Sequence, residues 1–265
     1  MSEFRKIVEC ELAKHGYSLE EDAYKDRENL LLALNTYEEI VKTCKEEIDS
    51  LNMYSKHESL NVGADYIENI TLFKLKSLKP ELTVCFVVDL YENNKTRGEF
   101  DVESNTIYIY MNSIYSDLET VIESGKEYPN AFVSTDDWFS LIRSKLCQDT
   151  FVHEFQHYLD NKRGIINNSV KKISNKKKSK EIDYWNDPIE TNAFYMQRLM
   201  NAANDLSKKY NKALRDMTPE ERLDFIKNSW KNNRTFMLYY NKLEPKAQKR
   251  LLSRLYQYFS TDFWK

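Results

Sequence analysis

Two histidines and a glutamate stand close together near the middle of the chain, in the order His153-Glu154-x-x-His157. Residues four apart share one face of an α-helix, so the two imidazoles can reach the same point. Imidazole nitrogen is a common ligand of zinc, and a glutamate at this spacing can take the proton of a water on the metal. The spacing therefore predicts a metal site with a general base. The alternative is a helix that exposes a few polar side chains to solvent.

A third metal ligand is expected downstream, and Glu190 is the best candidate. It follows Asp187 and Pro188, which suit the start of a helix as N-cap and first-turn residue. A carboxylate in the first turn is also favoured by the helix dipole, which is the alternative reason for a glutamate there. Ala193, three residues on, is small enough to let this helix approach the histidine helix. We favour the ligand role because the histidine pair precedes it.

His153, Glu154 and His157, followed by a glutamate on the next helix, resemble the gluzincin type of zinc metallopeptidase. The stretch from Glu190 to Phe194 also looks like the zinc peptidases of the ImmA/IrrE type, which are often phage-associated and act on repressors. The resemblance covers residues 82 to 200 or so, and its specific parts are the pentapeptide and the Glu190 segment. It implies Zn²⁺ as the cofactor, Glu154 as the catalytic base, and a protein or peptide as the substrate.

The chain departs from this family at one position. Many gluzincins carry an aspartate four residues after the third ligand, where it orients a zinc-bound histidine, and this chain has Phe194 there. Asp160, three residues past His157, is our candidate for that role. Tyr184 and Tyr195 flank the third ligand and are candidates for donating a hydrogen bond to the oxyanion of the transition state.

The elements around the motif can also be predicted. Apolar residues recur at helical spacing from 135 to 163 without an interrupting Pro or Gly, so we expect one long, mostly buried helix that Gly164 ends. Residues 82–91, 99–102 and 105–111 have strand-like composition, with a turn at 103–105 between the last two. The resemblance implies a small sheet before the histidine helix, and 105–112 is the candidate edge strand for binding substrate.

The remaining segments predict helices. The chain has only 5 Gly and 5 Pro in 265 residues, which favours long helices and few tight turns. We expect an α+β, mostly helical fold, with a zincin-like core and extra helices at both ends. Residues 1–60 form an N-terminal helical segment that packs on the core or serves as a partner-binding arm. Residues 61–265 form the metallopeptidase domain, with C-terminal helices at 219–232, 235–243 and 245–259.

Composition limits the classes of binding partner and the cellular compartment that we expect. A net charge of −3 gives no reason to expect nucleic acid as a partner. The 4 Cys show no CxxC spacing and are expected to be buried free thiols of a reducing compartment. No signal peptide or apolar run of about 20 residues stands out, so we expect a cytoplasmic protein without a membrane partner. Delivery into a host cell or association with a phage particle stays open.

The segment 171–180 is rich in lysine. We expect a solvated connector between the two ligand helices, with attraction of an acidic substrate as the alternative. Two functions from different classes therefore remain. One is a zinc endopeptidase, and the other is a binding, scaffold or regulatory protein with a non-proteolytic zinc site. The intact Glu154 favours the enzyme, because a scaffold has no use for a general base.

Overall fold

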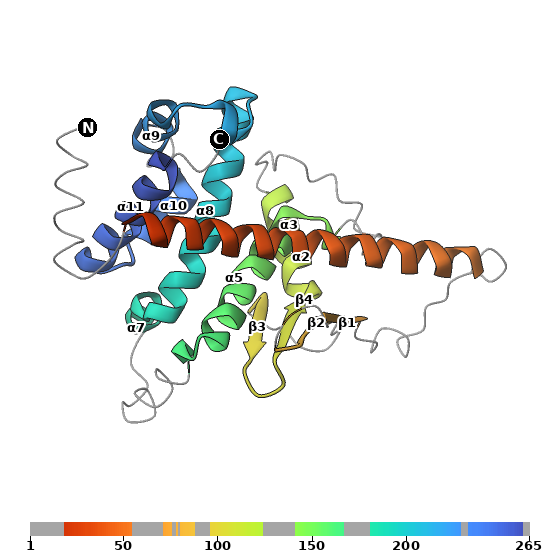
Figure 1. Cartoon of the computed structure of the whole chain (residues 1–265). Coiled ribbons are helices and arrows are strands. Elements are labelled where there is room, and N and C mark those ends of the chain that lie inside the picture. The colour runs from red at the N-terminus through yellow and green to blue at the C-terminus, as the bar shows by residue number, and fades with distance from the viewer. Residues whose placement is uncertain are drawn as a thin grey trace. The chain divides into compact units, whose positions relative to one another are not determined.

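The structure is a computed structural model that describes residues 19–54, 71–75, 78, 80–87, 96–123, 141–166, 181–228 and 233–261. It is mostly helical with one small sheet, as the sequence predicts (Figure 1). The described elements are α2 (Leu19–Tyr54), β1 (Thr71–Leu75), β2 (Leu82–Val87), β3 (Gly98–Asp101), β4 (Thr106–Tyr110), α3 (Met111–Glu123), α5 (Lys145–Lys162), α7 (Glu181–Asn186), α8 (Pro188–Tyr210), the 3₁₀ turn η3 (Leu214–Asp216), α9 (Pro219–Asn228), α10 (Arg234–Tyr240) and α11 (Pro245–Ser260).

The chain divides into two compact units. One comprises residues 1–31 and 169–265, and the other comprises residues 32–168. This division differs from the boundary expected at residue 60, because the first part of α2 groups with the C-terminal helices. Asp26 on α2 accepts hydrogen bonds from Tyr195 on α8 and Arg254 on α11. Residues 1–18 and 55–60 of the expected N-terminal helical segment, and the basic segment 171–180, lie outside the described residues.

The unit of residues 32–168 holds a four-stranded sheet in the order β1-β2-β4-β3. Strands β2 and β4 are parallel, with Val84 opposite Ile107, and the two outer pairs are antiparallel. The predicted strands are confirmed over residues 82–87, 98–101 and 106–110, and residues 88–91 lie outside the described part of the chain. The turn before β4 is confirmed, and Asn105 takes the left-handed conformation that such a turn favours, with φ 53°. The prediction of 105–112 as an edge strand is wrong. β4 lies inside the sheet, and β1 and β3 are its edges.

Helix α5 carries the histidine pair and packs beside β3 and β4 (Figure 1). Its start corrects the prediction of one helix from 135. Ser144 is extended, with ψ 148°, and its hydroxyl accepts a hydrogen bond from the Cys147 N–H, so the helix begins at Lys145. The predicted end is confirmed, because α5 ends at Lys162 and Gly164 has φ 72°. Residues 124–140 lie outside the described part of the chain.

An aromatic stripe fixes α5 within its unit. Phe151, Phe155 and Tyr158 stand one turn apart and are fully buried. The Phe151 ring lies 5.0 Å from the ring of Tyr37 on α2, and the Tyr158 hydroxyl donates to the carbonyl oxygen of Pro80 at 2.9 Å. These contacts hold α5 to α2 and to the chain before β2 within its unit.

The described elements of the other unit are helical, and α9, α10 and α11 confirm the three predicted C-terminal helices. Residues 229–232, the end of the first predicted helix, lie outside the described residues. Arg222 on α9 is 1% exposed and donates hydrogen bonds to four backbone carbonyl oxygens. Two belong to η3 and the residue that follows it, and two lie at the C-terminal end of α11; they are the carbonyls of Leu214, Met217, Phe259 and Thr261. This one side chain therefore ties α9 to both elements.

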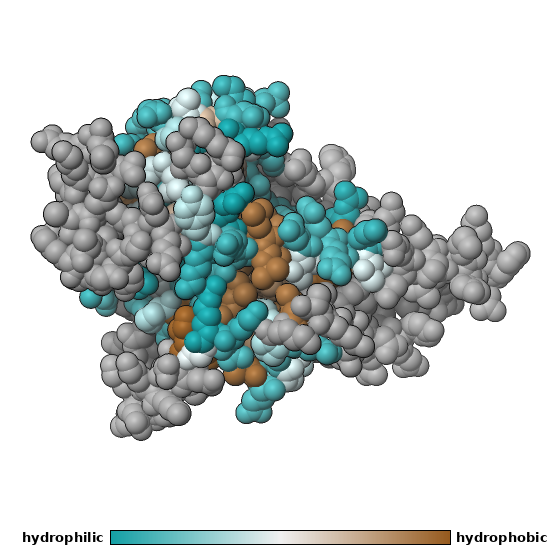
Figure 2. All heavy atoms as spheres, in the orientation of Figure 1, coloured by the Kyte–Doolittle hydropathy of each residue, from teal (hydrophilic) through white to brown (hydrophobic). Residues whose placement is uncertain are grey.

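The described surface carries both hydrophilic and hydrophobic side chains. Figure 2 shows hydrophilic side chains over much of the described part of this face, with hydrophobic ones among them. None of the described helices has the length and apolar character that crossing a membrane requires. Cys85 and Cys147 are buried free thiols, as predicted. Burial raises the pKa of the Cys85 thiol to about 11. The side chains of Cys10 and Cys44 lie outside the described residues.

Candidate metal centre

The histidine pair occupies one face of α5. The rings of His153 and His157 meet edge to face, with centroids 4.9 Å apart, and each side chain is 8% exposed. Glu154 is buried beside them at 6% exposed. The alternative of polar residues on a solvated helix face is therefore wrong. Burying two imidazoles and a carboxylate is costly unless they have partners, and a metal ion is a partner that suits imidazole.

Strand β3 comes unusually close to Glu154. A Cβ atom on Gly98 would lie 2.7 Å from Cγ2 of Thr150, 3.1 Å from Cγ of Glu154 and 3.1 Å from the Tyr108 carbonyl oxygen. Only glycine therefore fits between the edge strand and the helix at this point. The sequence held a signal for this contact, because an isolated glycine beside a strand pattern often marks a close approach of backbone.

Asp160 lies one turn beyond His157 and is 1% exposed. Its Oδ1 accepts a hydrogen bond from Nε2 of Gln156 at 2.8 Å. This bond holds one carboxylate oxygen to a neighbouring turn of the same helix. Its predicted role in orienting a histidine stays a prediction.

Glu190 lies in the first turn of α8, as predicted. The Asp187 side chain caps this helix by accepting from the Ile189 N–H at 2.8 Å, and Pro188 follows it in the first turn. Ala193 is fully buried, and its expected role in the approach to the histidine helix stays a prediction. The cap and the proline fix the start of α8, and thereby the direction in which Glu190 leaves the backbone.

Phe194, at the position where many gluzincins have an aspartate, belongs to an aromatic cluster. Its ring centroid lies 4.7 Å from that of Trp185 and 5.1 Å from that of Tyr239. Tyr184, 48% exposed, borders the cluster with its ring at edge-to-face contact with Phe194. The Lys242 ammonium lies 4.4 Å from the Trp185 ring centroid. Phe194 thus packs rather than donates, and the oxyanion role of Tyr184 stays a prediction.

Tyr195 is engaged elsewhere. Its hydroxyl donates to Oδ2 of Asp26 at 2.8 Å, and its ring lies 3.8 Å from the Arg254 guanidinium carbon. Burial and the nearby Asp26 carboxylate raise the pKa of this hydroxyl well above its ordinary value. The same proton cannot serve a substrate oxyanion, so the structure argues against the predicted role of Tyr195.

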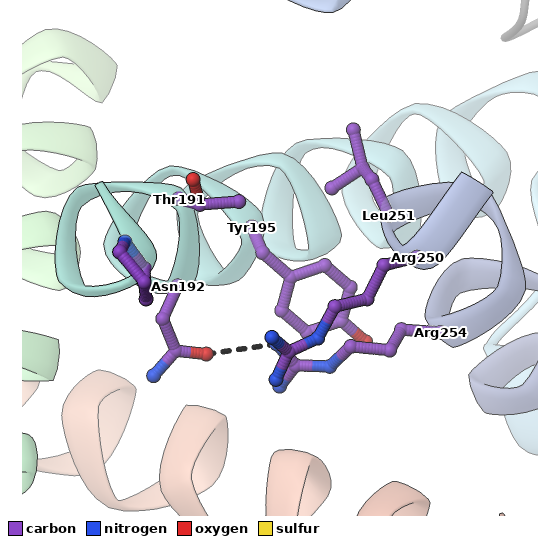
Figure 3. Close-up of a pocket in the computed structure, with 7 residues that line it drawn as sticks. Thr191, Asn192, Tyr195, Arg250, Leu251 and Arg254 are labelled. Carbon is purple, nitrogen blue, oxygen red and sulfur yellow. Dashed lines mark hydrogen bonds between the residues drawn. The ribbon is translucent and has the colours of Figure 1, made fainter. Parts of the chain in front are cut away.

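A small cavity next to Tyr195 is lined from α8 and α11. Figure 3 shows Arg250 and Arg254 reaching toward Asn192, whose Oδ1 accepts from Arg254 at 2.8 Å. The cavity volume is ≈ 20 Å³, which is room for about one water molecule and not for a peptide. It contains none of the predicted metal ligands, so we assign no substrate to it.

Sequence reasoning missed Tyr239. This residue lies 49 positions after Glu190 in the chain, and no spacing rule connects the two. Its ring packs on Phe194, and the Glu190 carboxylate is one of the charges that shift the pKa of its hydroxyl. Only the folded chain brings it into this neighbourhood.

The chain was also compared with known proteins. It matches no protein-family model, no curated protein and no solved structure. The argument for function therefore depends on the side chains themselves and on the chemistry that their types allow.

Proposed function

We propose that the chain has a zincin-like catalytic core and is a zinc-dependent peptidase that hydrolyses peptide bonds in a protein substrate. One observation carries the proposal. On α5 the rings of His153 and His157 meet edge to face with centroids 4.9 Å apart, and Glu154 is buried beside them. Glu190, in the first turn of α8, is the proposed third ligand.

The donor types fit zinc. Two neutral imidazoles and one carboxylate form a three-ligand set used by catalytic zinc sites, which keep a further position open. The set holds no thiolate, and the described cysteines are not part of it. Zinc bound here would supply Lewis acidity and lower the pKa of a coordinated water toward about 7.

Glu154 supplies the proton transfers. It directly follows His153 and lies three residues before His157, so it is a neighbour of the second histidine on the helix surface. Its carboxylate accepts the proton of the attacking water and afterwards gives it to the leaving amine. Its burial beside Gly98 and Thr150 restricts the positions open to the side chain. Glu154 is therefore proposed as the general base and then the general acid.

The test combines metal analysis with one conservative substitution. Wild type should bind about one zinc per chain, and His157→Ala and Glu190→Ala should bind much less. Glu154→Gln keeps the size of the side chain and removes no ligand, so it should retain zinc. Its turnover should fall by roughly a hundred-fold or more, because general-base catalysis is lost.

Proteolysis is measured by mass spectrometry of new termini in a protein mixture, with each protein at matched zinc occupancy. Glu220→Gln is the control, because Glu220 is an exposed glutamate on α9. Equal cleavage by wild type and Glu154→Gln would refute the peptidase. Full zinc binding without cleavage, with no difference between the two proteins, would favour the alternative of a scaffold or regulatory protein with a non-proteolytic zinc site.

A further inference from the structure

Tyr239 presents a buried hydroxyl that needs an explanation. The residue is 3% exposed, and its hydroxyl has no hydrogen-bond partner among the residues that the structure describes. A buried polar group without a partner destabilises the folded state, because it has lost its hydrogen bonds to water. Such groups are few in folded proteins, and a functional role is one reason why they persist.

The ring of Tyr239 lies over one face of α8. Glu190, Phe194 and Arg198 are spaced four residues apart, so they follow one another along that face. The ring centroid of Tyr239 is 5.1 Å from that of Phe194 and 5.8 Å from the guanidinium carbon of Arg198. Tyr239 is thus packed on the middle of the three, one helical turn from Glu190.

The charges on this face act on the hydroxyl. Burial raises the pKa of Tyr239, the Arg198 guanidinium lowers it, and the Glu190 carboxylate raises it. At neutral pH the group therefore remains a neutral O–H donor. The Glu190 carboxylate is near enough to influence this donor, although the two do not form a hydrogen bond in this structure.

We infer that Tyr239 is a positioning residue, whose hydroxyl donates a hydrogen bond to the Glu190 carboxylate when Glu190 acts as a metal ligand. The inference rests on the zinc site proposed above. A carboxylate that gives one oxygen to a metal has a second oxygen that can accept from a donor. Phe194, packed against Tyr239, has no donor of its own. Donors that hold a metal-bound side chain commonly change metal affinity by about 10- to 100-fold.

The test is Tyr239→Phe, which removes one oxygen and keeps the ring. We expect zinc to bind at least about 10-fold more weakly, measured by competition with a chromophoric chelator. The unfolding free energy of the metal-free variant should equal or exceed that of wild type, because an unpaired buried hydroxyl is removed. The visible spectrum of the Co²⁺-substituted protein should also change, because it reports ligand geometry at the metal. Tyr240→Phe, one residue further on α10 and half-buried, is the matched control.

A second variant separates positioning from general stability. In a Glu190→Ala background, Tyr239→Phe should produce no further loss of zinc affinity, since no carboxylate remains to be held. Unchanged zinc affinity and Co²⁺ spectrum in Tyr239→Phe would overturn the inference and leave the zinc site intact. A drop in metal-free stability that accounts for the lost affinity would also overturn it. If wild type binds no zinc, the proposed function fails, and the inference fails with it.

Discussion

Gly98 is the residue on which the approach of β3 to Glu154 depends. An added Cβ would meet Cγ2 of Thr150 at 2.7 Å and the Tyr108 carbonyl oxygen at 3.1 Å. The carbonyl belongs to the neighbouring strand and cannot move without disturbing the sheet. Overpacking of this kind typically costs about 1–3 kcal/mol. Glu154 would be displaced as well, because its Cγ lies in the same gap.

We therefore expect Gly98→Ala to lower the unfolding free energy by about 1–3 kcal/mol. It should also reduce turnover of the proposed peptidase more than its proposed zinc binding. Thr150→Ser removes the methyl group in closest contact and keeps the hydroxyl that donates to the Leu146 carbonyl at 2.9 Å. The double variant should recover part of the lost stability, measured by urea unfolding. A Gly98→Ala protein as stable and active as wild type would show that the strand can withdraw from the helix without cost.

At the scale of elements, Arg222 joins α9 to η3 and to the end of α11. Replacing it with methionine leaves four backbone carbonyl oxygens without their donor and keeps most of the apolar stem. We expect the unfolding free energy to fall by about 3 kcal/mol or more. Urea unfolding of Arg222→Met measures the loss. The control is Arg215→Met, whose side chain is 74% exposed, and equal midpoints for the two variants would contradict the assignment.

Elements whose ends depend on local signals could be predicted from the sequence. Asp187 and Pro188 fixed the start of α8, and Gly164 fixed the end of α5, because caps act within one turn. The start of α5 was missed, since an apolar pattern extends through Ser144 although its side chain caps the next turn. The sheet order was also missed. The parallel pairing of β2 with β4 places β4 inside the sheet, and no local pattern reports such pairing.

The same distinction applies to the candidate site. His153, Glu154 and His157 could be identified from the sequence because they lie within five consecutive residues. Glu190 could be identified because it follows a recognisable helix cap. The partners of the surrounding tyrosines are not local. Tyr195 meets Asp26 across 169 positions of the chain. Whether a tyrosine hydroxyl is available to a substrate therefore depends on the tertiary fold.

At the scale of the whole molecule, buried acidic groups set the limit of stability at high pH. Burial raises the pKa of Cys85 from 9.0 to about 11, and it raises the pKa values of the buried Tyr195, Tyr239 and Tyr258. Each of these groups loses its proton more easily when the chain is unfolded. The stabilisation that these protonated groups contribute is therefore fully present below the pKa values of the unfolded chain. It is lost as the pH rises toward the higher pKa values of the folded protein.

We expect the free energy of unfolding to fall between pH 9 and 11, with Cys85 accounting for about 2 kcal/mol near pH 10.5. Cys85→Ala removes that titration, so its unfolding free energy should decline less over the same range. Urea unfolding at pH 8 and pH 10.5 gives the comparison. Cys147→Ala, at the second buried thiol, is the control for loss of side-chain volume. Parallel declines in wild type and Cys85→Ala would contradict the assignment to Cys85.

The gap at Gly98 has a consequence for how this gene can change. Every single-base change in the first two positions of a glycine codon either introduces a side chain with a Cβ atom or stops translation. No single-base change therefore replaces Gly98 with another residue without loss of stability, since the Cβ of any replacement meets the same backbone oxygen at about 3.1 Å. In a library of all substitutions, tolerance at this position should be restricted to glycine, even though the neighbouring Arg97 and Glu99 are exposed.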